Sequence, residues 1–237
     1  MPAHLHHTGK ETTMAEAVSH PLFARLYPRI NAFAEAHGSV EHRRELLAGV
    51  RGRVIEIGAG TGANFRHYPP EVEEVVAVEP EPRLRALAER AVTGAPVPVR
   101  VVSGRAEELP VPDGNFDAAV ISLVLCTLPD VPGSLAEAAR VLKPGGELRF
   151  YEHVRSQKRS ILRRQRMLNP PWRLLCGGCN LTRDTERAIT EAGFTVDEIR
   201  RFDFLINGRS TPASPSIIGI ARPPAAGQER GGVMNQV

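Results

Sequence analysis

The sequence predicts an α/β protein in which helices pack on both faces of one open, mostly parallel sheet, the doubly wound arrangement. Apolar runs rich in β-branched residues alternate with helical patterns along most of the chain, as parallel strands joined by helices require. The first of these runs, 53–57, also leads into a tight turn with a glycine at every second position, and a helical pattern follows. Both observations favour a sheet with a ligand site at the ends of its strands.

Two helices are expected before the first strand. Apolar residues recur at near-helical spacing over 14–37, where two prolines kink or split the helix, and a second helix is predicted over 41–48. These helices have no place in the sheet, so they could form a cap over the site. Phe23 and Tyr27 are then candidates to line the pocket, although the same rings could simply pack the cap onto the domain.

The remaining elements alternate along the chain. The expected strands cover 53–57, 74–79, 97–102, 116–123, 147–151, 194–204 and 216–221. The expected helices between them cover 61–68, 81–91, 131–142 and 182–192.

A basic amphipathic segment occupies 154–169, where six arginines and lysines stand among apolar residues. Its basic side could rest on anionic lipid, cover an apolar acceptor, or simply be solvated. Because Trp172 and two leucines follow, we expect 154–181 to form the variable substrate lid.

The glycine-rich turn predicts a small ligand lying across it. Glycine is needed where backbone adopts positive φ or approaches a ligand closely, as expected at Gly58, Gly60 and Gly62. The spacing Gly58-x-Gly60-x-x-Ala63 also fits the dinucleotide pattern loosely. A nicotinamide-dependent oxidoreductase is therefore an alternative from a different class.

Two acidic residues help to separate these alternatives. Glu56 precedes the first glycine by two residues, where its carboxylate would repel the pyrophosphate of a dinucleotide. A ligand with an ammonium group and no phosphate suits this position better, and S-adenosylmethionine has that group in its methionine part. Glu79 ends the second expected strand, where an acid can accept hydrogen bonds from ribose hydroxyls. We therefore expect S-adenosyl-L-methionine as cofactor and S-adenosyl-L-homocysteine as product.

The other motifs also follow expected strands. They cover 104–107, 122–127 and 152–153. Because ligands of open α/β sheets bind beyond the carboxyl ends of the strands, these motifs and the glycine turn predict one common site.

With these motifs in place, the chain resembles the class I S-adenosylmethionine-dependent methyltransferases over about 51–221. The motifs that carry the resemblance are Glu56-x-Gly58-x-Gly60-x-Gly62, Glu79, Ala106-Glu107-x-Leu109-Pro110, Phe116-Asp117 and Leu142-Lys143-Pro144-Gly145-Gly146. Within this superfamily the chain is similar to the ubiquinone/menaquinone-biosynthesis methyltransferases. It is more closely similar to the methyltransferase-like family that includes the alkyl thiol S-methyltransferases. That closer likeness is carried by Gly60-Thr61-Gly62-Ala63-Asn64-Phe65 with Tyr68-Pro69-Pro70, by Leu123-Val124-Leu125-Cys126, and by Glu152-His153 with Cys179-Asn180-Leu181-Thr182-Arg183-Asp184-Thr185.

The resemblance implies a Rossmann-like sheet of seven strands with the last strand antiparallel. It also implies that 58–62 borders the methionine part of the cofactor, that Glu79 binds the ribose, and that Ala106 and Glu107 lie beside the adenine. The expected cofactor site also includes Glu56, Thr61, Asn64, Phe65, Pro80 and Leu123. Many relatives carry an aspartate where this chain has Arg105, so a side-chain acceptor for the adenine amino group is not expected here. The hydrophobic N-terminal membrane anchor of some relatives has no counterpart in the sequence.

Methyl transfer from a sulfonium is an in-line displacement that depends on alignment more than on covalent catalysis. A thiol acceptor, with a free pKa of about 8.5, supplies a usable thiolate fraction at neutral pH, whereas a hydroxyl acceptor needs a base. His153 is the candidate base, although it could equally be a structural histidine in the wall. Tyr27, Cys126, Glu152 and Trp172 are the candidate substrate contacts, and Cys126 could instead be a small buried apolar residue.

The three cysteines form no disulfide framework, which is typical of a reducing compartment. Cys176 and Cys179 make a lone C-x-x-C, so we expect no structural metal site. Together with Cys126 they could bind a soft metalloid, which leaves arsenite as an alternative substrate. Three histidines near the start, His4, His6 and His7, could bind stray metal or belong to a flexible polar terminus.

Bulk properties narrow the class of protein further. The chain has 237 residues, a net charge of +3, and 30 basic against 27 acidic side chains, a balance that does not favour nucleic acid binding. No apolar run approaches the roughly 18 residues that span a bilayer, so a cytoplasmic protein is expected, with peripheral membrane contact still open. The composition makes no prediction of oligomeric state.

We expect one domain over 14–222 between disordered segments at 1–13 and 223–237. Its parts are a helical cap (14–50), a cofactor-binding core (51–153), the lid (154–181) and a C-terminal helix with strands (182–222). The predicted function is methyl transfer to a small lipophilic acceptor, with a thiol favoured. Quinone-type or natural-product C- or O-methylation is the alternative of the same fold, and a non-catalytic cofactor-binding module is a further one.

Overall fold

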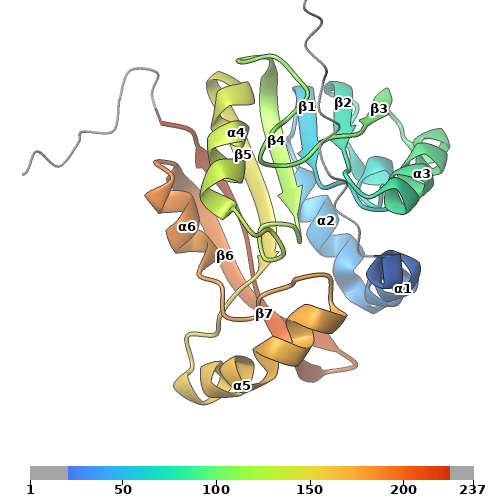
Figure 1. Cartoon of the computed structure of the whole chain (residues 1–237). Helices are drawn as coiled ribbons and strands as arrows, with labels where there is room; N and C mark the ends of the chain where they lie inside the picture. The colour runs from blue at the N-terminus through green and yellow to red at the C-terminus, as the bar shows by residue number, and fades with distance from the viewer. Residues whose placement is uncertain (1–20, 225–237) are drawn as a thin grey trace, which may run out of the picture.

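The computed structural model describes residues 21–224, and these residues form one seven-stranded sheet with helices on both faces (Figure 1). The strands are β1 (Gly52–Ile57), β2 (Val72–Val78), β3 (Val99–Val102), β4 (Phe116–Ser122), β5 (Leu142–His153), β6 (Thr195–Ile206) and β7 (Arg209–Arg222). Their order across the sheet is β3-β2-β1-β4-β5-β7-β6. The strands β1 to β5 pair in parallel, whereas β7 pairs antiparallel with both β5 and β6. The predicted doubly wound fold with an antiparallel last strand is confirmed.

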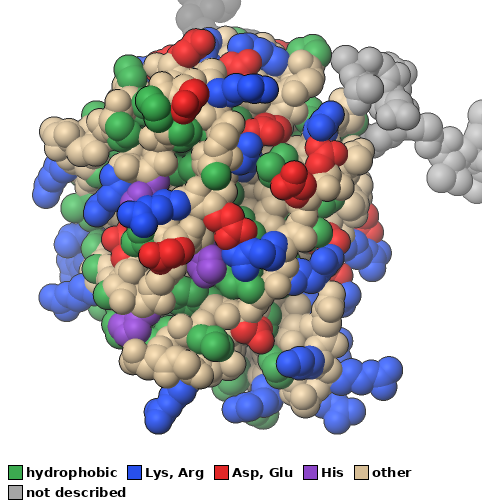
Figure 2. Space-filling model, turned by 180° about the vertical axis from the view of Figure 1, so that it is seen from behind, with side chains coloured by type: hydrophobic (Ala, Val, Ile, Leu, Met, Phe, Trp, Pro, Cys, Tyr) green, Lys and Arg blue, Asp and Glu red, His purple; other side chains and the backbone are tan. Residues whose placement is uncertain are grey.

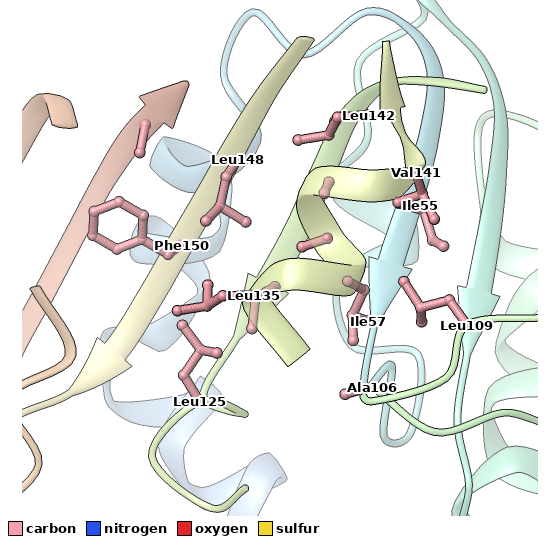
Figure 3. Packing of buried hydrophobic residues seen from close by; sticks show 14 of the residues in the cluster. Ile55, Ile57, Ala106, Leu109, Leu125, Leu135, Val141, Leu142, Leu148 and Phe150 are labelled. Atoms are coloured by element: carbon pink, nitrogen blue, oxygen red, sulfur yellow. The ribbon is translucent and has the colours of Figure 1, made fainter. Parts of the chain in front are cut away.

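Alternate residues of the central strands face opposite sides of the sheet, and each side buries its own hydrophobic cluster. Ile55 and Ile57 of β1 belong to the cluster covered by α4 (Val131–Val141) and α6 (Thr185–Glu191). Figure 3 shows Leu135 of this cluster, on α4, lying between the strands and the helix. The other cluster packs against α2 (Val40–Leu47) and α3 (Pro82–Ala91). Because β1 is an inner strand of the sheet and is covered on both faces, the position of the turn that follows it is fixed by the core.

The two N-terminal helices, α1 (Pro21–Ala34) and α2, follow each other directly and are separated by a kink. The helix α1 continues through a π-helical turn, Glu35–Ser39, into α2, and the bend lies at His37 and Gly38, whose backbone leaves helical geometry. The predicted helix over 14–37 is confirmed from Pro21 onward, whereas 14–20 and the expected disordered segment 1–13 lie outside the described residues. Residues 225–237, most of the expected tail, lie outside them as well.

The predicted helix over 61–68 is wrong. The chain after β1 makes consecutive turns and then one 3-10 turn, Phe65–His67. Gly62 has a φ of 76°, which is incompatible with a right-handed helix, and the ring of Phe65 is fully buried. The glycines that create the turn therefore also prevent the helix that the pattern suggested.

The other predicted elements agree with the structure within a few residues, with two extensions. The strand predicted over 147–151 begins at Leu142, directly after α4, and the strand predicted over 216–221 is the longer β7. A two-residue turn at Asn207 and Gly208, both with positive φ, joins β6 to β7. The basic segment forms α5 (Arg159–Leu175), later than predicted.

Two helices lie beyond the carboxyl ends of the parallel strands. Figure 1 places α1 and α5 together at this end of the sheet, which is the lower end in that view. Seen from behind in Figure 2, acidic and basic side chains are interspersed over the molecule, and basic side chains gather along the lower edge. No helix within 21–224 is both long and apolar enough to cross a membrane.

Candidate functional site

A cavity of about 370 Å³ lies at the carboxyl ends of β1, β2 and β4. Its wall comes from α1, from the loops after these strands and after β3, and from the loop after α5. The lining residues are Phe23, Tyr27, Gly58, Gly60, Val78, Glu79, Pro80, Glu81, Leu84, Gly104, Arg105, Ala106, Glu107, Ser122, Leu123, Val124, Thr127, Leu128, Pro129, Arg173, Gly177 and Gly178. The size suits a small organic ligand, and the position is the one expected for an open α/β sheet.

The glycine turn after β1 forms one side of this cavity. Gly58 and Gly60 have φ values of 74° and 57°, which only glycine adopts without strain. A Cβ at Gly58 would lie 2.6 Å from Cγ2 of Val124, and one at Gly60 would lie 3.1 Å from the ring of Tyr27. The missing side chains therefore let the turn pack against the cap and the loop after β4, and they keep backbone exposed to the cavity.

Glu79 forms the neighbouring part of the wall. Its carboxylate accepts hydrogen bonds from the backbone N–H of Gly60 at 2.7 Å and of Glu81 at 3.0 Å. Burial raises the pKa of this carboxyl, and the two N–H donors act against the rise. The side chain is thus fixed in place while its oxygens keep further lone pairs for a ligand with hydroxyl donors.

Glu56 lies beneath the turn and does not line the cavity. Its two oxygens accept hydrogen bonds from Nδ2 of Asn64 at 2.9 Å and from the hydroxyl of Tyr68 at 2.8 Å. Burial raises its pKa to about 7, because the cost of desolvation outweighs these hydrogen bonds. In this structure Glu56 supports the turn from below.

Arg43, which the sequence did not single out, joins the cap to this turn. Its guanidinium donates hydrogen bonds to Asn64 at 2.8 Å and to Asn31 of α1 at 2.8 Å, with a longer contact to Ser122 of β4 at 3.4 Å. The side chain is only 4% exposed. An arginine within a polar helix has no sequence signal that separates it from its solvated neighbours, so only the packing of α2 identifies it.

Glu152 supports the loop after β4 in a similar way. It is fully buried, and its carboxylate accepts hydrogen bonds from the backbone N–H groups of Val124, Leu125 and Cys126 at 2.9–3.0 Å. The loop begins at Leu123, whose φ of 60° is unusual for a residue with a side chain. Glu152 therefore positions the cavity wall without lining it.

The predicted residues His153, Cys126 and Cys179 lie together next to the cavity. The Sγ atoms of the cysteines are 3.9 Å apart, and Nδ1 of His153 is 3.8 Å from Sγ of Cys179. Side-chain hydrogen bonding with Cys126 and His153 lowers the pKa of the Cys179 thiol despite its burial. Burial opposes protonation of His153, but the contact with Cys179 outweighs it and raises the pKa of the imidazole. None of the three side chains lines the cavity.

The structure brings some predicted site residues into the cavity wall and leaves others behind it. Those in the wall are Phe23, Tyr27, Gly58, Gly60, Glu79, Pro80, Ala106, Glu107 and Leu123. Those outside the lining are Glu56, Thr61, Gly62, Asn64, Phe65, Cys126, Glu152, His153 and Trp172. Asn64 and Phe65 are buried beneath the turn, and Trp172 is half-buried. The wall also includes Arg173, Gly177 and Gly178, for which the sequence had given only the general prediction of a lid.

Comparison with known proteins gives a consistent result. Residues 55–150 match the family described as methyltransferase domain. The chain is 37% identical over 158 residues to the thiol S-methyltransferase TMT1A of Homo sapiens, with 63% of each chain covered, and 33% identical over 216 residues to the human thiol S-methyltransferase TMT1B, with 84% of each covered. The first of these matches thus spans somewhat less than two thirds of the relative's length.

A more distant relative and a solved structure agree. The chain is 32% identical over 153 residues to the demethylmenaquinone methyltransferase of Tropheryma whipplei (strain Twist), covering 62% of this chain and 61% of the relative. Its fold is similar to that of the S-adenosylmethionine dependent methyltransferase from Mesorhizobium loti, with a TM-score of 0.59 and 20% identity over 80% of this chain and 99% of that one. At this identity the second match supports the fold alone.

Proposed function

Since this chain belongs to the class I S-adenosylmethionine-dependent methyltransferases, we propose that it transfers a methyl group from S-adenosylmethionine to a small lipophilic thiol. The observation that carries the proposal is the cavity between the glycine turn, Glu79 and the loop after β4. Backbone at Gly58 and Gly60 can approach the cofactor closely there, and Glu79 offers oxygens for the ribose hydroxyls. When bound, the cofactor supplies an electrophilic methyl group on a sulfonium.

The rest of the wall favours an apolar acceptor. Phe23, Leu123, Val124 and Leu128 present apolar surface to the cavity, and its polar residues other than Glu79 are spread over several segments of the wall. Burying an apolar acceptor against such side chains favours binding and excludes water from the reacting groups. The helix α5 also exposes Met167, Leu174 and Leu175, which do not line the cavity.

The lining also suggests why a thiol suits the site. No histidine from the described residues lines the cavity, and His153 contacts Cys179 instead. A thiol ionises far enough near neutral pH to react with little help from a base, whereas a hydroxyl does not. The two human relatives are named thiol S-methyltransferases, which agrees with this choice of acceptor.

A quinone-type acceptor is the second candidate, because one relative is named a demethylmenaquinone methyltransferase. Such a molecule is also apolar, but carbon or oxygen methylation needs removal of a proton from a weaker acid. We expect that reaction to depend on a base such as His153, so replacement of His153 by alanine should slow hydroxylated aromatic acceptors more than thiols. Equal loss on both acceptor types would remove His153 from this role.

Release of S-adenosylhomocysteine tests the proposal directly. The full chain is incubated with S-adenosylmethionine and a panel of apolar thiols, hydroxylated aromatics and arsenite, and we expect turnover chiefly with the thiols. Calorimetric titration should show binding of S-adenosylhomocysteine and none of NAD. Binding without turnover on any acceptor would instead indicate a non-catalytic binding module.

Replacement of Glu79 tests the cofactor assignment. Hydrogen bonds to a charged group contribute about 1.5–3 kcal/mol each, so Glu79→Ala should weaken S-adenosylhomocysteine binding at least tenfold, by an order-of-magnitude argument. Glu108→Ala is the matched control, because Glu108 is an exposed glutamate in the loop after β3 and does not line the cavity. Equal affinities in the two variants would mean that the cofactor binds elsewhere.

Contact with a membrane surface is a further proposal for α5. The helix carries five arginines together with exposed Met167, Leu174 and Leu175, a combination that suits anionic lipid. Co-sedimentation with phosphatidylserine vesicles should then be strong at low salt and weak at high salt. Absence of binding at both salt concentrations would contradict the proposal.

A further inference from the structure

Three side chains from distant parts of the sequence meet behind the cavity wall. Cys126 follows β4, His153 ends β5, and Cys179 lies in the loop after α5. One ligand atom from each, Sγ, Nδ1 and Sγ, lies within 4.8 Å of the other two. Within the part of the chain that the structure describes, these are the potential metal ligands that come together in this way.

The distances suit a tetrahedral metal ion. Zinc binds cysteine sulfur at about 2.3 Å and histidine nitrogen at about 2.0–2.1 Å, so two ligands of one tetrahedral ion lie about 3.6–3.8 Å apart. The observed separations are 3.9 Å between the two sulfurs and 3.8 Å between Nδ1 of His153 and Sγ of Cys179. An ion could therefore enter this group with movements of a few tenths of an ångström at these two edges.

The backbone around the group is held firmly. The N–H of Cys126 donates to Glu152 at 3.0 Å, and its carbonyl accepts from the N–H of Asn180 at 2.8 Å. Gly178, with a φ of 89°, packs so closely on the loop after β4 that a Cβ there would lie 3.0 Å from the carbonyl oxygen of Thr127. Such preorganisation lowers the cost of assembling ligands from three segments.

A divalent ion would also neutralise the charge of the three deprotonated ligands. Cys126 and Cys179 are buried, with 1% and 6% exposure, and a buried net charge is costly. Two thiolates and a neutral imidazole carry a charge of −2, which one divalent cation neutralises. Two sulfur ligands and one imidazole suit zinc, whereas magnesium and calcium prefer oxygen ligands.

We propose that Cys126, His153 and Cys179 bind a Zn²⁺ ion as three of its four tetrahedral ligands, with the fourth position left to a water or another small ligand. The ion would connect the ends of β4 and β5 to the loop after α5, of which Gly177 and Gly178 line the cavity. This goes beyond the lone C-x-x-C considered from sequence, because Cys176 is not part of the group. The site would hold the outer wall of the cavity against the sheet, and it does not depend on which acceptor is methylated.

Metal binding by the full chain tests the proposal. The protein is stripped with a chelator under reducing conditions, reloaded with Zn²⁺, dialysed and assayed for bound zinc, with one ion per chain expected. Loading with Co²⁺ should give thiolate-to-cobalt charge-transfer absorption and the intense visible bands of a tetrahedral site. Failure to retain zinc, or a cobalt spectrum without thiolate bands, would overturn the proposal even if no variant folds.

Variants identify the ligands. Cys126→Ser, Cys179→Ser and His153→Ala should each weaken Zn²⁺ binding at least about tenfold. Replacing a residue that only orients a metal ligand already weakens metal binding by about that factor, so replacing a ligand itself should cost at least as much. Cys176→Ser is the matched control and should retain the metal. A variant with alanine at His4, His6 and His7 should also retain it, since these histidines are not part of the site.

Three outcomes would contradict the assignment. Equal loss of zinc in Cys176→Ser would indicate a different ligand set, and loss on removal of the three N-terminal histidines would indicate binding outside the proposed site. A disulfide between Cys126 and Cys179, detected by mass spectrometry in the reduced preparation, would also exclude the metal. Titration of the same samples with S-adenosylhomocysteine reports separately on the cofactor cavity.

Discussion

Single buried carboxylates hold two of the loops that form the cavity. Glu152 accepts three backbone hydrogen bonds from the loop after β4, and Glu79 accepts two, one from Gly60 of the glycine turn and one from Glu81. Each carboxylate accepts hydrogen bonds from N–H groups that would otherwise be bonded to water. Removal of the carboxylate therefore leaves several buried donors without partners. The cost should therefore appear in stability as well as in ligand binding.

Glu152→Ala is expected to lower the free energy of unfolding by about 3 kcal/mol or more, because three buried N–H groups lose their acceptor. Glu152→Gln keeps one acceptor oxygen and should cost less. Urea denaturation measures both values, and Glu73→Ala, at an exposed position, should stay within about 0.5 kcal/mol of the parent protein. A loss below about 1 kcal/mol in Glu152→Ala would contradict the supporting role.

The ionisation of Glu56 should make stability depend on pH. Its pKa is raised to about 7 in the folded protein, whereas the ordinary glutamate value is 4.5. Between these values the folded state keeps a proton that the unfolded state has lost. The contribution of Glu56 is therefore fully present below about pH 4.5 and is lost as pH rises towards 7, by at most about 1.4 kcal/mol per pH unit.

The variant Glu56→Gln removes this titration, so its free energy of unfolding should fall less than that of the parent protein between about pH 5 and pH 8. Glu152 also has a pKa raised to about 7 by burial, but it is present in both proteins and cancels in the comparison. Urea denaturation at several pH values measures the difference. Parallel curves would show that Glu56 is already ionised throughout this range.

At the scale of elements, Arg43 of α2 is one of the residues that connect the cap to the core. Arg43 joins Asn31, Asn64 and Ser122, and thereby connects α1, the glycine turn and β4. Its neighbour Arg44 lies exposed on the same helix. The two arginines are indistinguishable by composition and differ only in the direction that the helix gives them.

Arg43→Met should lower the free energy of unfolding by about 2–4 kcal/mol, because the buried amide of Asn64 and the half-buried amide of Asn31 lose their donor. It should also weaken S-adenosylhomocysteine binding, since Tyr27 on the cap lines the cavity. Arg44→Met is the control and should change neither quantity appreciably. Equal effects of the two substitutions on urea denaturation would show that the hydrogen bonds of Arg43 are not what holds the cap.

Most elements could be predicted because their patterns are strong and local. The five parallel strands are apolar runs, and the glycine or proline residues near their ends are visible in the sequence. The helix over 61–68 was predicted wrongly, because the conformation of this segment depends on tertiary packing. Gly62 packs closely against α3 and Phe65 is buried in the core, and no local sequence pattern reveals either contact. The extension of β5 back to Leu142 likewise depends on pairing with β4.

At the scale of the whole molecule, the cavity is assembled from segments between Phe23 and Gly178 that meet only in the fold. Its inner part could be predicted, since the carboxyl ends of parallel strands lie at one edge and bring Gly58, Glu79 and Ala106 together. The orientation of Glu56, Glu152 and His153 could not. Each follows or ends a strand, and whether such a side chain faces a ligand or supports a loop depends on neighbours distant in sequence.

Because the cavity joins the cap, the sheet and the loop after α5, a ligand that fills it should stabilise the chain as a unit. At a concentration about 100-fold above its Kd, S-adenosylhomocysteine adds about 2.7 kcal/mol to the free energy of unfolding, which corresponds to roughly 5–11 °C in Tm for a chain of this size. NAD at the same concentration should leave Tm unchanged, and Glu79→Ala should lose most of the shift. Scanning calorimetry measures all three, and a shift by NAD equal to that by S-adenosylhomocysteine would contradict the assignment of the cavity to the methyl donor.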